Sequence, residues 1–314
     1  MAKKSIPSII KQIQKYKLPE VNYAFQKAIS YSQLSTYLAC GKKWELNYKD
    51  GNFTSSPSIN MTFGTSLHET LQHYITVMYE ESGTKADEID LTEHFEGSFQ
   101  KAYQADYDKN KKVHFSNPVE MREFYDDGIA ILDFIKKKRG EYFSKRGWYL
   151  VGCEVPILIT PDKRYNRVLY KGYLDLVLYH EPTNKFVIYD IKTATKSWGD
   201  KEKKDEIKQM QLVLYKQFFS EQFGIPVDDI EVEFMILKRK IWENSEFPQK
   251  RIQKFIPASG KNKIIKSKKA VIDFIEDVFN GDGSYKDKIY SSSPSKWNCR
   301  FCAYAGSLCK DAIL

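Results

Sequence analysis

The chain has 314 residues, 42% of them hydrophobic, which is enough for one large domain or two small ones. Lysine and arginine number 49 against 41 acidic residues, and the formal net charge of +8 favours a polyanionic partner only weakly. No apolar run reaches the roughly 18 residues that a membrane span needs, and the basic stretch at residues 1–16 lacks the apolar core of a secretory signal. We therefore expect a cytoplasmic protein that makes no contact with a membrane.

The first part of the chain is predicted to be helical after a basic, partly disordered lead-in over residues 1–29. Apolar residues recur at helical spacing from Ser30 to Trp44, and residues 51–60 are turn-rich and predict a loop. A second helix is expected to begin near Ser66, because Ser66 and Glu69 have the spacing of a capping box. Its apolar face would carry Leu67, Leu71, Tyr74, Ile75 and Met78, and two more helices are predicted over about 89–107 and 119–145.

The pattern changes to strands after Trp148. Three strands are predicted over residues 149–160, 168–180 and 185–193, the last two joined by the short loop EPTN of a hairpin. A helix over about 204–223, strands over 229–238 and near 250–256, and a helix near 266–280 follow. This order predicts an α/β core preceded by a helical region.

Two aspartates and a lysine form the strongest chemical pattern. Asp175 lies inside an apolar strand, and Asp190 and Lys192 share one face of the next strand because side chains alternate. If the two strands pair, both carboxylates converge on one point, where they suit a hard divalent cation such as Mg²⁺. The alternative is two edge-strand acids with a surface lysine, but a lone buried carboxylate is costly unless it is paired or bound to metal.

The spacing of this group resembles a nuclease signature. Gly172-x-x-Asp175, then fourteen residues, then Asp190-x-Lys192, is similar to the active-site motif of PD-(D/E)XK nucleases, and closest to their RecB/AddB-like branch. In that branch the residue before the first acid need not be proline, and here it is Leu174. The resemblance implies catalysis by Asp175, Asp190 and Lys192 with Mg²⁺ or Mn²⁺.

Three further segments match the same branch. Gly64–His68 resembles its upstream histidine motif, which implies that His68 is a metal ligand together with Asp175 and Asp190. Glu154 matches an acid that faces the catalytic site, and Gln211-x-x-x-Tyr215 resembles a motif associated with substrate contact. Taken singly, each has an ordinary explanation: a helix histidine, a solvent-facing strand acid and a surface pair. We also expect His68 to lie in the first turn of its helix, where the positive helix end favours the neutral imidazole.

Four cysteines are expected to form a second centre. Cys299-x2-Cys302-x6-Cys309 lies far from Cys40 in the sequence, and the arrangement resembles the iron–sulfur variant of RecB/AddB-like nucleases, with Gly41 where that family often has proline. The resemblance implies a [4Fe–4S] cluster held by these four residues. Four thiolates also suit tetrahedral zinc, and unliganded buried cysteines are the remaining alternative. Cys153, next to Glu154, is expected to be a core residue, and a cluster would act as a structural staple rather than a redox centre.

The resemblance implies a restriction-endonuclease-like mixed sheet of order αβββαβ, with an N-terminal helical region and a C-terminal cysteine tail. The predicted units are a lead-in (1–29), a helix with the first cluster cysteine (30–60), a helical region with the histidine motif (61–147), the nuclease core (148–260), and a helix with the remaining cysteines (261–314).

The expected function is hydrolysis of DNA phosphodiester bonds, with exonuclease action on single-stranded ends in recombination, repair or end processing. Lys196 is a candidate phosphate contact, together with Lys201, Lys203, Lys204 and the basic runs 136–139 and 261–269, although a solvated basic face explains such runs equally well. A helicase or recombination protein is the expected partner, in a prokaryotic or phage-infected cell. The alternatives are a CRISPR-adaptation-type nuclease and a non-catalytic DNA-binding subunit with the same fold.

Overall fold

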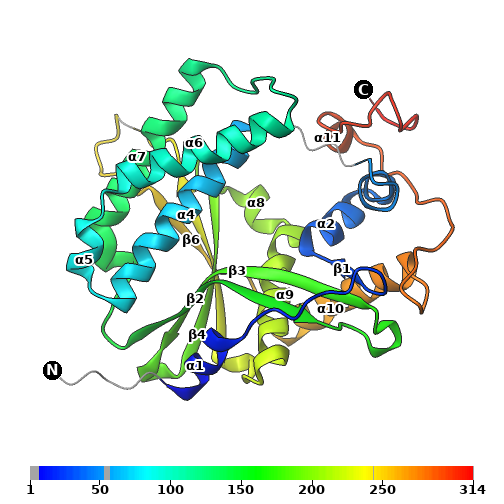
Figure 1. Ribbon diagram of the computed structural model, residues 1–314, viewed down its shortest axis with the longest axis horizontal. Coiled ribbons are helices and arrows are strands. Elements are labelled where there is room, and N and C mark those ends of the chain that lie inside the picture. The colour runs from blue at the N-terminus through cyan, green and yellow to red at the C-terminus, as the bar shows by residue number, and fades with distance from the viewer. Residues whose placement is uncertain (1–6, 53–56, 243, 314) are drawn as a thin grey trace.

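A mixed sheet of six strands forms the centre of the computed structural model, which describes residues 7–52, 57–242 and 244–313 (Figure 1). Within these residues the hydrogen-bonded order is β1–β3–β4–β5–β6, and β2 pairs with β3. The strands are β1 (Lys27–Ile29), β2 (Trp148–Ile159), β3 (Val168–His180), β4 (Lys185–Ala194), β5 (Ile230–Lys238) and β6 (Ile252–Phe255). The pairs β1–β3 and β4–β5 are parallel, and the other pairs are antiparallel.

One edge of β3 is shared between two strands. β1 pairs with residues 168–170 of β3, and β4 pairs with residues 176–180, while β2 follows residues 170–180 on the opposite edge. Residues 171–175 therefore have no strand partner on the shared edge. Figure 1 shows β3 and β4 diverging, and we call the unpaired stretch of β3, residues 171–175, the β3 gap.

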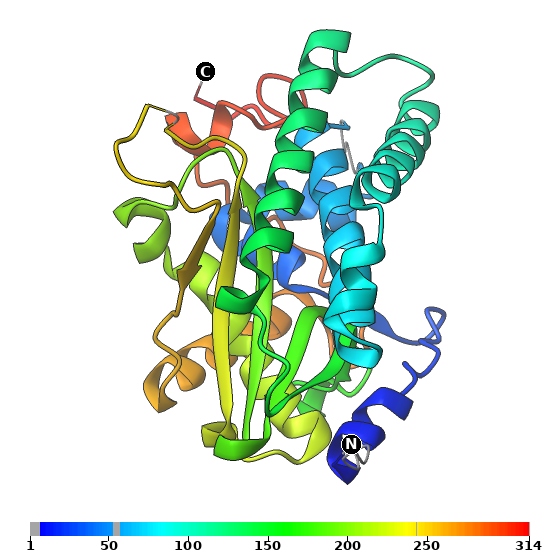
Figure 2. The same ribbon diagram turned by 90° about the vertical axis from the view of Figure 1, so that its left-hand side faces the viewer.

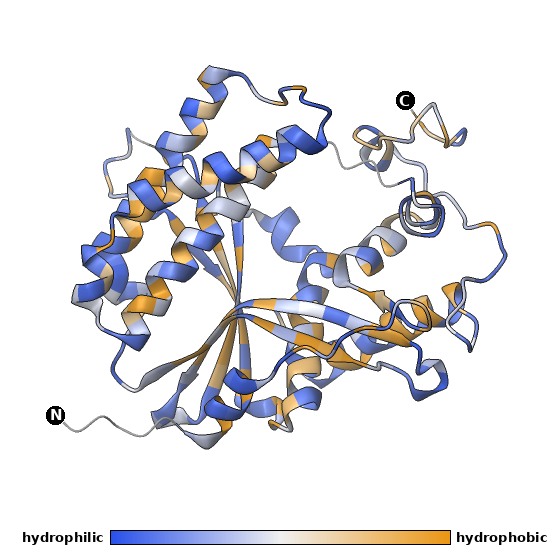
Figure 3. Ribbon diagram, in the orientation of Figure 1, coloured by the Kyte–Doolittle hydropathy of each residue, from blue (hydrophilic) through white to orange (hydrophobic). Residues whose placement is uncertain are grey.

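Helices cover both faces of the sheet. One face packs against α4 (Ile59–Glu80), α5 (Gly83–Glu88), α6 (Leu91–Lys109) and α7 (Pro118–Tyr142), and the other against α9 (Glu206–Phe223) and α10 (Lys261–Val278). Alternation along β5 produces this division, since Phe234 and Ile236 join the α9 core, whereas Met235 and Leu237 join the α4 core. Figure 3 shows apolar residues concentrated on the central strands and polar residues on the outer helices.

The remaining helices are short. They are α1 (Ser8–Lys15), α2 (Tyr31–Ala39), α3 (Gly41–Trp44), a π-helix (Glu45–Lys49), α8 (Asp200–Lys204), α11 (Lys296–Cys299) and 3-10 turns at Lys163–Tyr165, Glu181–Thr183 and Val227–Asp229. Trp44 is fully buried, and its ring contacts the rings of Phe274 on α10 and Tyr290 in the C-terminal segment. This aromatic packing ties α3 to the far end of the sequence.

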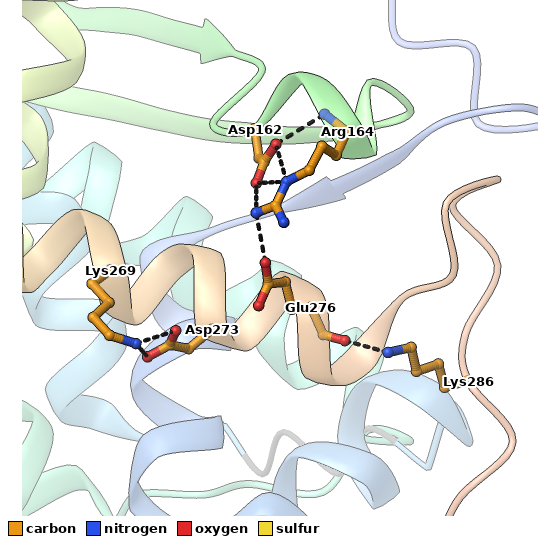
Figure 4. A network of polar contacts seen from close by, with 6 residues as sticks. All are labelled: Asp162, Arg164, Lys269, Asp273, Glu276 and Lys286. Carbon is orange, nitrogen blue, oxygen red and sulfur yellow. Dashed lines mark hydrogen bonds and ion pairs between the residues drawn. The ribbon is translucent and has the colours of Figure 1, made fainter.

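A polar network fastens α10 to the turn between β2 and β3 (Figure 4). Arg164 donates to Asp162 within the turn and to Glu276 on α10, and the backbone carbonyl of Glu276 accepts from Lys286. Lys269 and Asp273 form a separate ion pair on the same helix at 2.6 Å. The Arg164 side chain is largely exposed, so the network contributes little stability beyond orienting the turn.

The expected order of three strands, a helix and a strand after the helical region is confirmed, as are the helices over 89–107 and 119–145. The lead-in expectation is wrong for residues 8–15 and 27–29, which form α1 and β1; residues 1–6 lie outside the described residues. The buried Ile10 and Ile13 hold α1 against the core, and a strand of three residues is too short to leave a periodic signal. The helical pattern from Ser30 is also broken at Cys40, where the backbone is extended.

The predicted start of the second helix is wrong. α4 begins at Ile59, and Ser58 caps it by accepting a hydrogen bond from the Asn60 N–H. Ser66 is buried within the helix and donates to the carbonyl of Thr62 at 2.9 Å. The capping-box spacing at Ser66 is therefore coincidental. The helix also includes residues 59–65, of which 59 and 60 were expected to belong to the loop 51–60. Residues 53–56 of that expected loop lie outside the described residues. The expected apolar face of this helix is buried as predicted.

Among the described residues, no helix combines the length and the apolar character that crossing a membrane requires.

The packing between α6 and α7 gives a test of the core. We expect Gly128→Ala to lower the free energy of unfolding by about 1–3 kcal/mol, because an added Cβ at this buried position would lie 2.4 Å from the ring of Phe95. Gly140→Ala on the same helix meets nothing within 4 Å and should raise it by up to about 1 kcal/mol through helix propensity. Urea unfolding of both variants measures the difference, and equal stabilities would contradict the packing.

Candidate active site and cysteine pocket

The two aspartates meet at the β3 gap. Pairing between β3 and β4 ends at Leu176 and Tyr189, and one residue further the side chain of Asp175 takes the place of a strand partner. Its Oδ2 accepts a hydrogen bond from the backbone N–H of Ile191 at 2.7 Å. Asp175 is thus held against β4 immediately beside Asp190.

Asp190 is almost completely buried, with 1% of its surface exposed. Its Oδ2 lies 2.8 Å from Nζ of Lys192, whereas Oδ1 is buried and has no hydrogen-bond partner among the described residues. A buried carboxylate oxygen without a partner is unfavourable unless a cation or a donor reaches it. The acid pair and Lys192 therefore form one electrostatic unit that is open to a further positive charge.

The pKa values of this unit are shifted by burial and by mutual charge. Burial and the neighbouring carboxylate of Asp190 raise the pKa of Asp175, and burial raises that of Asp190, against the lowering effect of Lys192. Burial acts against the charged form of Lys192, but Asp190 and Asp175 outweigh it and raise the pKa of the ammonium. Two adjacent carboxylates that resist ionising together are typical of a site for a divalent cation.

His68 is half-buried on α4, with Nδ1 4.0 Å from Oδ2 of Asp175. It is the tenth residue of α4, so the expectation that it lies in a first turn beside the positive helix end is wrong. The neutral imidazole has a different cause, since burial and then the charge of Lys192 lower the pKa of His68 to about 4. The imidazole therefore faces Asp175 in the form that a metal requires.

Glu154 lies opposite Asp175 in the pairing of β2 with β3, between Cys153 and Val155. Its backbone has φ +51°, in the left-handed region that is unfavourable for a non-glycine residue. Gln72 of α4 donates from Nε2 to Oε1 of Glu154 at 2.8 Å and to the backbone carbonyl of Asp175 at 2.9 Å. The sequence interpretation missed Gln72, although its position four residues after His68 places both side chains on one face of α4.

A cleft of about 440 Å³ opens at the β3 gap. Glu154, Asp175, Gln211 and Tyr215 line it together with residues from the β1–α2 segment and β3, chiefly Tyr31, Lys171, Gly172 and Tyr173. Gln211 donates to the hydroxyl of Tyr215 at 3.3 Å, and a Cβ at Gly172 would lie 3.1 Å from the ring of Tyr215. Tyr31, which donates to the carbonyl of Ile207, was also missed, because its hydroxyl is fixed by a segment distant in the sequence.

The donor set suits a divalent cation held partly by the substrate. Among the described residues no three His, Cys, Asp or Glu side chains lie close enough to enclose a metal ion. Mg²⁺ needs only one or two protein carboxylates, because water and phosphate oxygens complete its octahedron. The carboxylates of Asp175 and Asp190 fit that mode of binding, because Oδ1 of Asp190 has no hydrogen-bond partner among the described residues and is free to bind a cation.

A family model for the PD-(D/E)XK nuclease superfamily matches residues 28–310. The chain belongs to this superfamily. The expected α/β fold with a mixed central sheet is confirmed, and membership implies a nuclease. The solved structure entitled "Crystal structure of SSO0001" is 12% identical and covers 98% of this chain and 94% of its own, with a TM-score of 0.36. No curated protein sequence matches the chain significantly.

Four of the five cysteines line one pocket of about 200 Å³, although Cys40 is far from the other three in the sequence. The pocket is formed by Cys40, Cys299, Cys302 and Cys309 with Trp297 and Tyr304 among its walls. The Ser293 N–H donates to Sγ of Cys40 at 3.4 Å, and the hydroxyl of Tyr304 reaches the carbonyl of Asn52 at 2.7 Å. Cys153 lies elsewhere, beside Thr76, and burial raises the pKa of its thiol to about 11.

Most of the predicted basic runs are neutralised within the protein. Lys263 and Lys266 bind Glu206, Lys268 binds Glu221, and Arg139 binds Asp87. Lys204 pairs with Asp200 of its own helix, and Lys201 lies 4.1 Å from the ring centre of Trp297. Lys196 has no carboxylate partner among the described residues.

The left-handed backbone at Glu154 predicts an unusual stability difference. Glu154→Ala and Glu154→Gly both remove the carboxylate, but only glycine is free of the steric cost at φ +51°. We expect the glycine variant to be more stable than the alanine variant by about 1 kcal/mol in urea unfolding. An alanine variant that is as stable as the glycine variant would show that this backbone conformation carries no strain.

Proposed function

We propose that the protein is a metal-dependent deoxyribonuclease that hydrolyses phosphodiester bonds at the β3 gap. The observation that carries the proposal is the buried acid pair, with Lys192 2.8 Å from Asp190 and an oxygen of Asp190 left without a partner among the described residues. A protein that only bound DNA would have no need to bury these charges side by side. This weighs against the alternative of a non-catalytic DNA-binding subunit.

Hydrolysis joins the oxygen of water to phosphorus and breaks the bond from phosphorus to one bridging oxygen; the water loses a proton and the leaving oxygen gains one. A Mg²⁺ or Mn²⁺ ion held by Asp175 and Asp190, with His68 beside them, would supply the charge that polarises the phosphoryl group. Lys192 Nζ orients the attacking water and offsets the negative charge that develops on the phosphate. Gln72 of α4 donates to Glu154 of β2 and to the carbonyl of Asp175 on β3, so that Asp175 keeps its position.

The substrate that we favour is a single-stranded DNA end. The cleft at the gap carries exposed aromatic rings, since Tyr23 is 60% and Tyr173 41% exposed, and Nζ of Lys171 lies 5.8 Å from the ring centre of Tyr173. Such rings stack on unpaired bases, and lysines contact the backbone. Gln211 and Tyr215 would position the strand. With a single-stranded end as substrate, we infer exonuclease action in recombination, repair or end processing. The expected partner is a helicase or recombination protein. The alternative, a CRISPR-adaptation-type nuclease, uses the same chemistry.

We further propose that Cys40, Cys299, Cys302 and Cys309 hold a [4Fe–4S] cluster with a structural role. A single tetrahedral zinc would need four sulfurs within about 4 Å of one another, from zinc–sulfur bonds of about 2.3 Å. Among the described residues no three His, Cys, Asp or Glu side chains are grouped so that they could hold a single metal ion, yet all four cysteines surround one pocket of about 200 Å³. The arrangement therefore suits a group larger than one ion.

The nuclease proposal is tested with end-labelled DNA in Mg²⁺, Mn²⁺ or EDTA. Asp190→Asn and Lys192→Ala should each lower cleavage by at least about 100-fold, because each removes charge stabilisation from the transition state. Asp229→Asn is the matched control, since Asp229 pairs with Lys185 at the opposite end of the same strands, 3.2 Å away. Cleavage that survives EDTA, or that is unchanged in either active-site variant, would refute the assignment.

Circular and linear substrates separate the two modes of cleavage. We expect linear single strands to be degraded and closed circles of the same sequence to persist, because only the linear form offers an end to the cleft. Nicking of the circle at a comparable rate would make the protein an endonuclease.

If the four cysteines hold a structural cluster, removing one of them should cost both the cluster and thermal stability. Cys302→Ser should abolish visible absorbance and iron content and lower the melting temperature by more than about 4 °C, whereas Cys153→Ala, outside the pocket, should retain both absorbance and iron. Elemental analysis decides the occupant: iron supports the cluster, and stoichiometric zinc without iron contradicts it.

A further inference from the structure

A second groove lies beyond the catalytic residues, at the ends of β4 and β5. It has a volume of about 660 Å³ and is lined by Lys196, Lys238, Lys240, Ile241, Trp242 and Gln249. Figure 2 shows the segment after β5 and α8 at the same end of the sheet. We call it the Trp242 groove.

The groove lies at the end of the sheet and shares Lys238 with the face that carries Asp190 and Lys192. β4 and β5 are parallel and in register, with Lys192 opposite Ile236 and Ala194 opposite Lys238. Lys238 therefore points to the same face as Lys192 and lies about 7 Å further along the strand direction. Backbone hydrogen bonds from Arg239 to Ala194 and from Lys240 to Thr195, both 2.9 Å, extend the pairing into the groove wall. Lys196 follows the end of β4, four residues after Lys192, and lies in the groove wall, so the end of this strand leads from the acid pair to the groove.

The positive charge of the groove resides on two lysines. Lys240 is neutralised by α7, since its Nζ lies 2.9 Å from Glu123 and 3.1 Å from Asp127. Lys196 and Lys238 have no carboxylate partner among the described residues. This contrasts with Lys263, Lys266, Lys268 and Lys269 of α10, which bind acids of α9 and of α10 itself. Unpaired ammonium groups on a concave surface favour an anionic ligand.

Trp242 adds a flat apolar surface to this charge. Its indole is 70% exposed, although a side chain of this size is normally buried. Phe247, in the same segment between β5 and β6, is 74% exposed. Exposed aromatic rings beside unpaired lysines are the combination by which proteins hold single-stranded nucleic acid, with rings stacking on bases and ammonium groups contacting phosphates.

We propose that the Trp242 groove binds DNA as a single strand, on the other side of the catalytic centre from the cleft at the β3 gap. Lys196 and Lys238 contact its phosphates, and Trp242 stacks on an unpaired base. The strand then crosses the acid pair between two aromatic and basic surfaces. A duplex is excluded from the stacking contact, because its bases present no free face to the indole. This inference rests on the proposed nuclease function and extends it.

The test measures binding separately from cleavage. In an Asp190→Asn background with Mg²⁺, fluorescence anisotropy is recorded for a labelled single strand of about 20 nucleotides and for a duplex of the same sequence. Trp242→Ala should weaken single-strand binding by about 5- to 100-fold, equivalent to the loss of one stacked base, and Trp242→Phe should restore most of it. Duplex binding should change by less than about twofold. Melting curves verify that each variant is folded.

The charge contribution has its own matched pair. Lys196→Ala with Lys238→Ala should weaken binding and reduce the dependence of log Kd on log salt concentration by up to about 2. Lys11→Ala with Lys15→Ala removes the same charge from exposed positions on α1, at the other end of the sheet, and should leave the dependence nearly unchanged.

The outcomes separate the two proposals. Unaltered single-strand binding by Trp242→Ala, or an equal loss for single strand and duplex, overturns the Trp242 groove even if the wild-type protein cleaves DNA. Absence of cleavage by the wild type, with binding that still depends on Trp242, overturns the nuclease function and leaves the groove as a DNA-binding site.

Discussion

The β3 gap is the constraint on which the rest of the site depends. β1 and β4 divide one edge of β3 between them, and residues 171–175 are left without a neighbour on that side. In a continuous ladder the N–H of Ile191 would bond to backbone; here the carboxylate of Asp175 accepts it at 2.7 Å. The Asp175 side chain therefore takes the place of a backbone partner in the sheet and also lines the cleft. A change in the pairing of β3 with β4 would for this reason also move a residue of the site.

The strands and the acid pair were accessible from the sequence because each leaves a local signal. Alternation predicts β2 to β5 to within a few residues, and Asp175 is conspicuous in the sequence as an aspartate inside an apolar strand. His68 lies 4.0 Å from Asp175, but the expected cause of its neutral form is wrong, because that form comes from burial and Lys192 and not from a helix end.

The features that escaped prediction are all set by contacts between distant segments. β1 is a strand only because β3 offers it an edge, and Gln72 has a role only because Glu154 lies opposite Asp175. The left-handed backbone of Glu154 has no sequence signature, since glutamate gives no hint of positive φ. The basic runs misled in the opposite direction, because composition does not reveal that α9 supplies the acids that neutralise α10.

The contact between Ser293 and Cys40 joins residues that are 253 positions apart in the sequence. During synthesis β1 cannot pair until β3 has been made, and Cys40 cannot make its contact until Ser293 has left the ribosome. Such non-local closure slows folding and prolongs the exposure of unpaired edges and thiols in partly made molecules. The architecture thus makes the nascent chain dependent on the speed of translation and on whatever protects it before the last cysteine emerges.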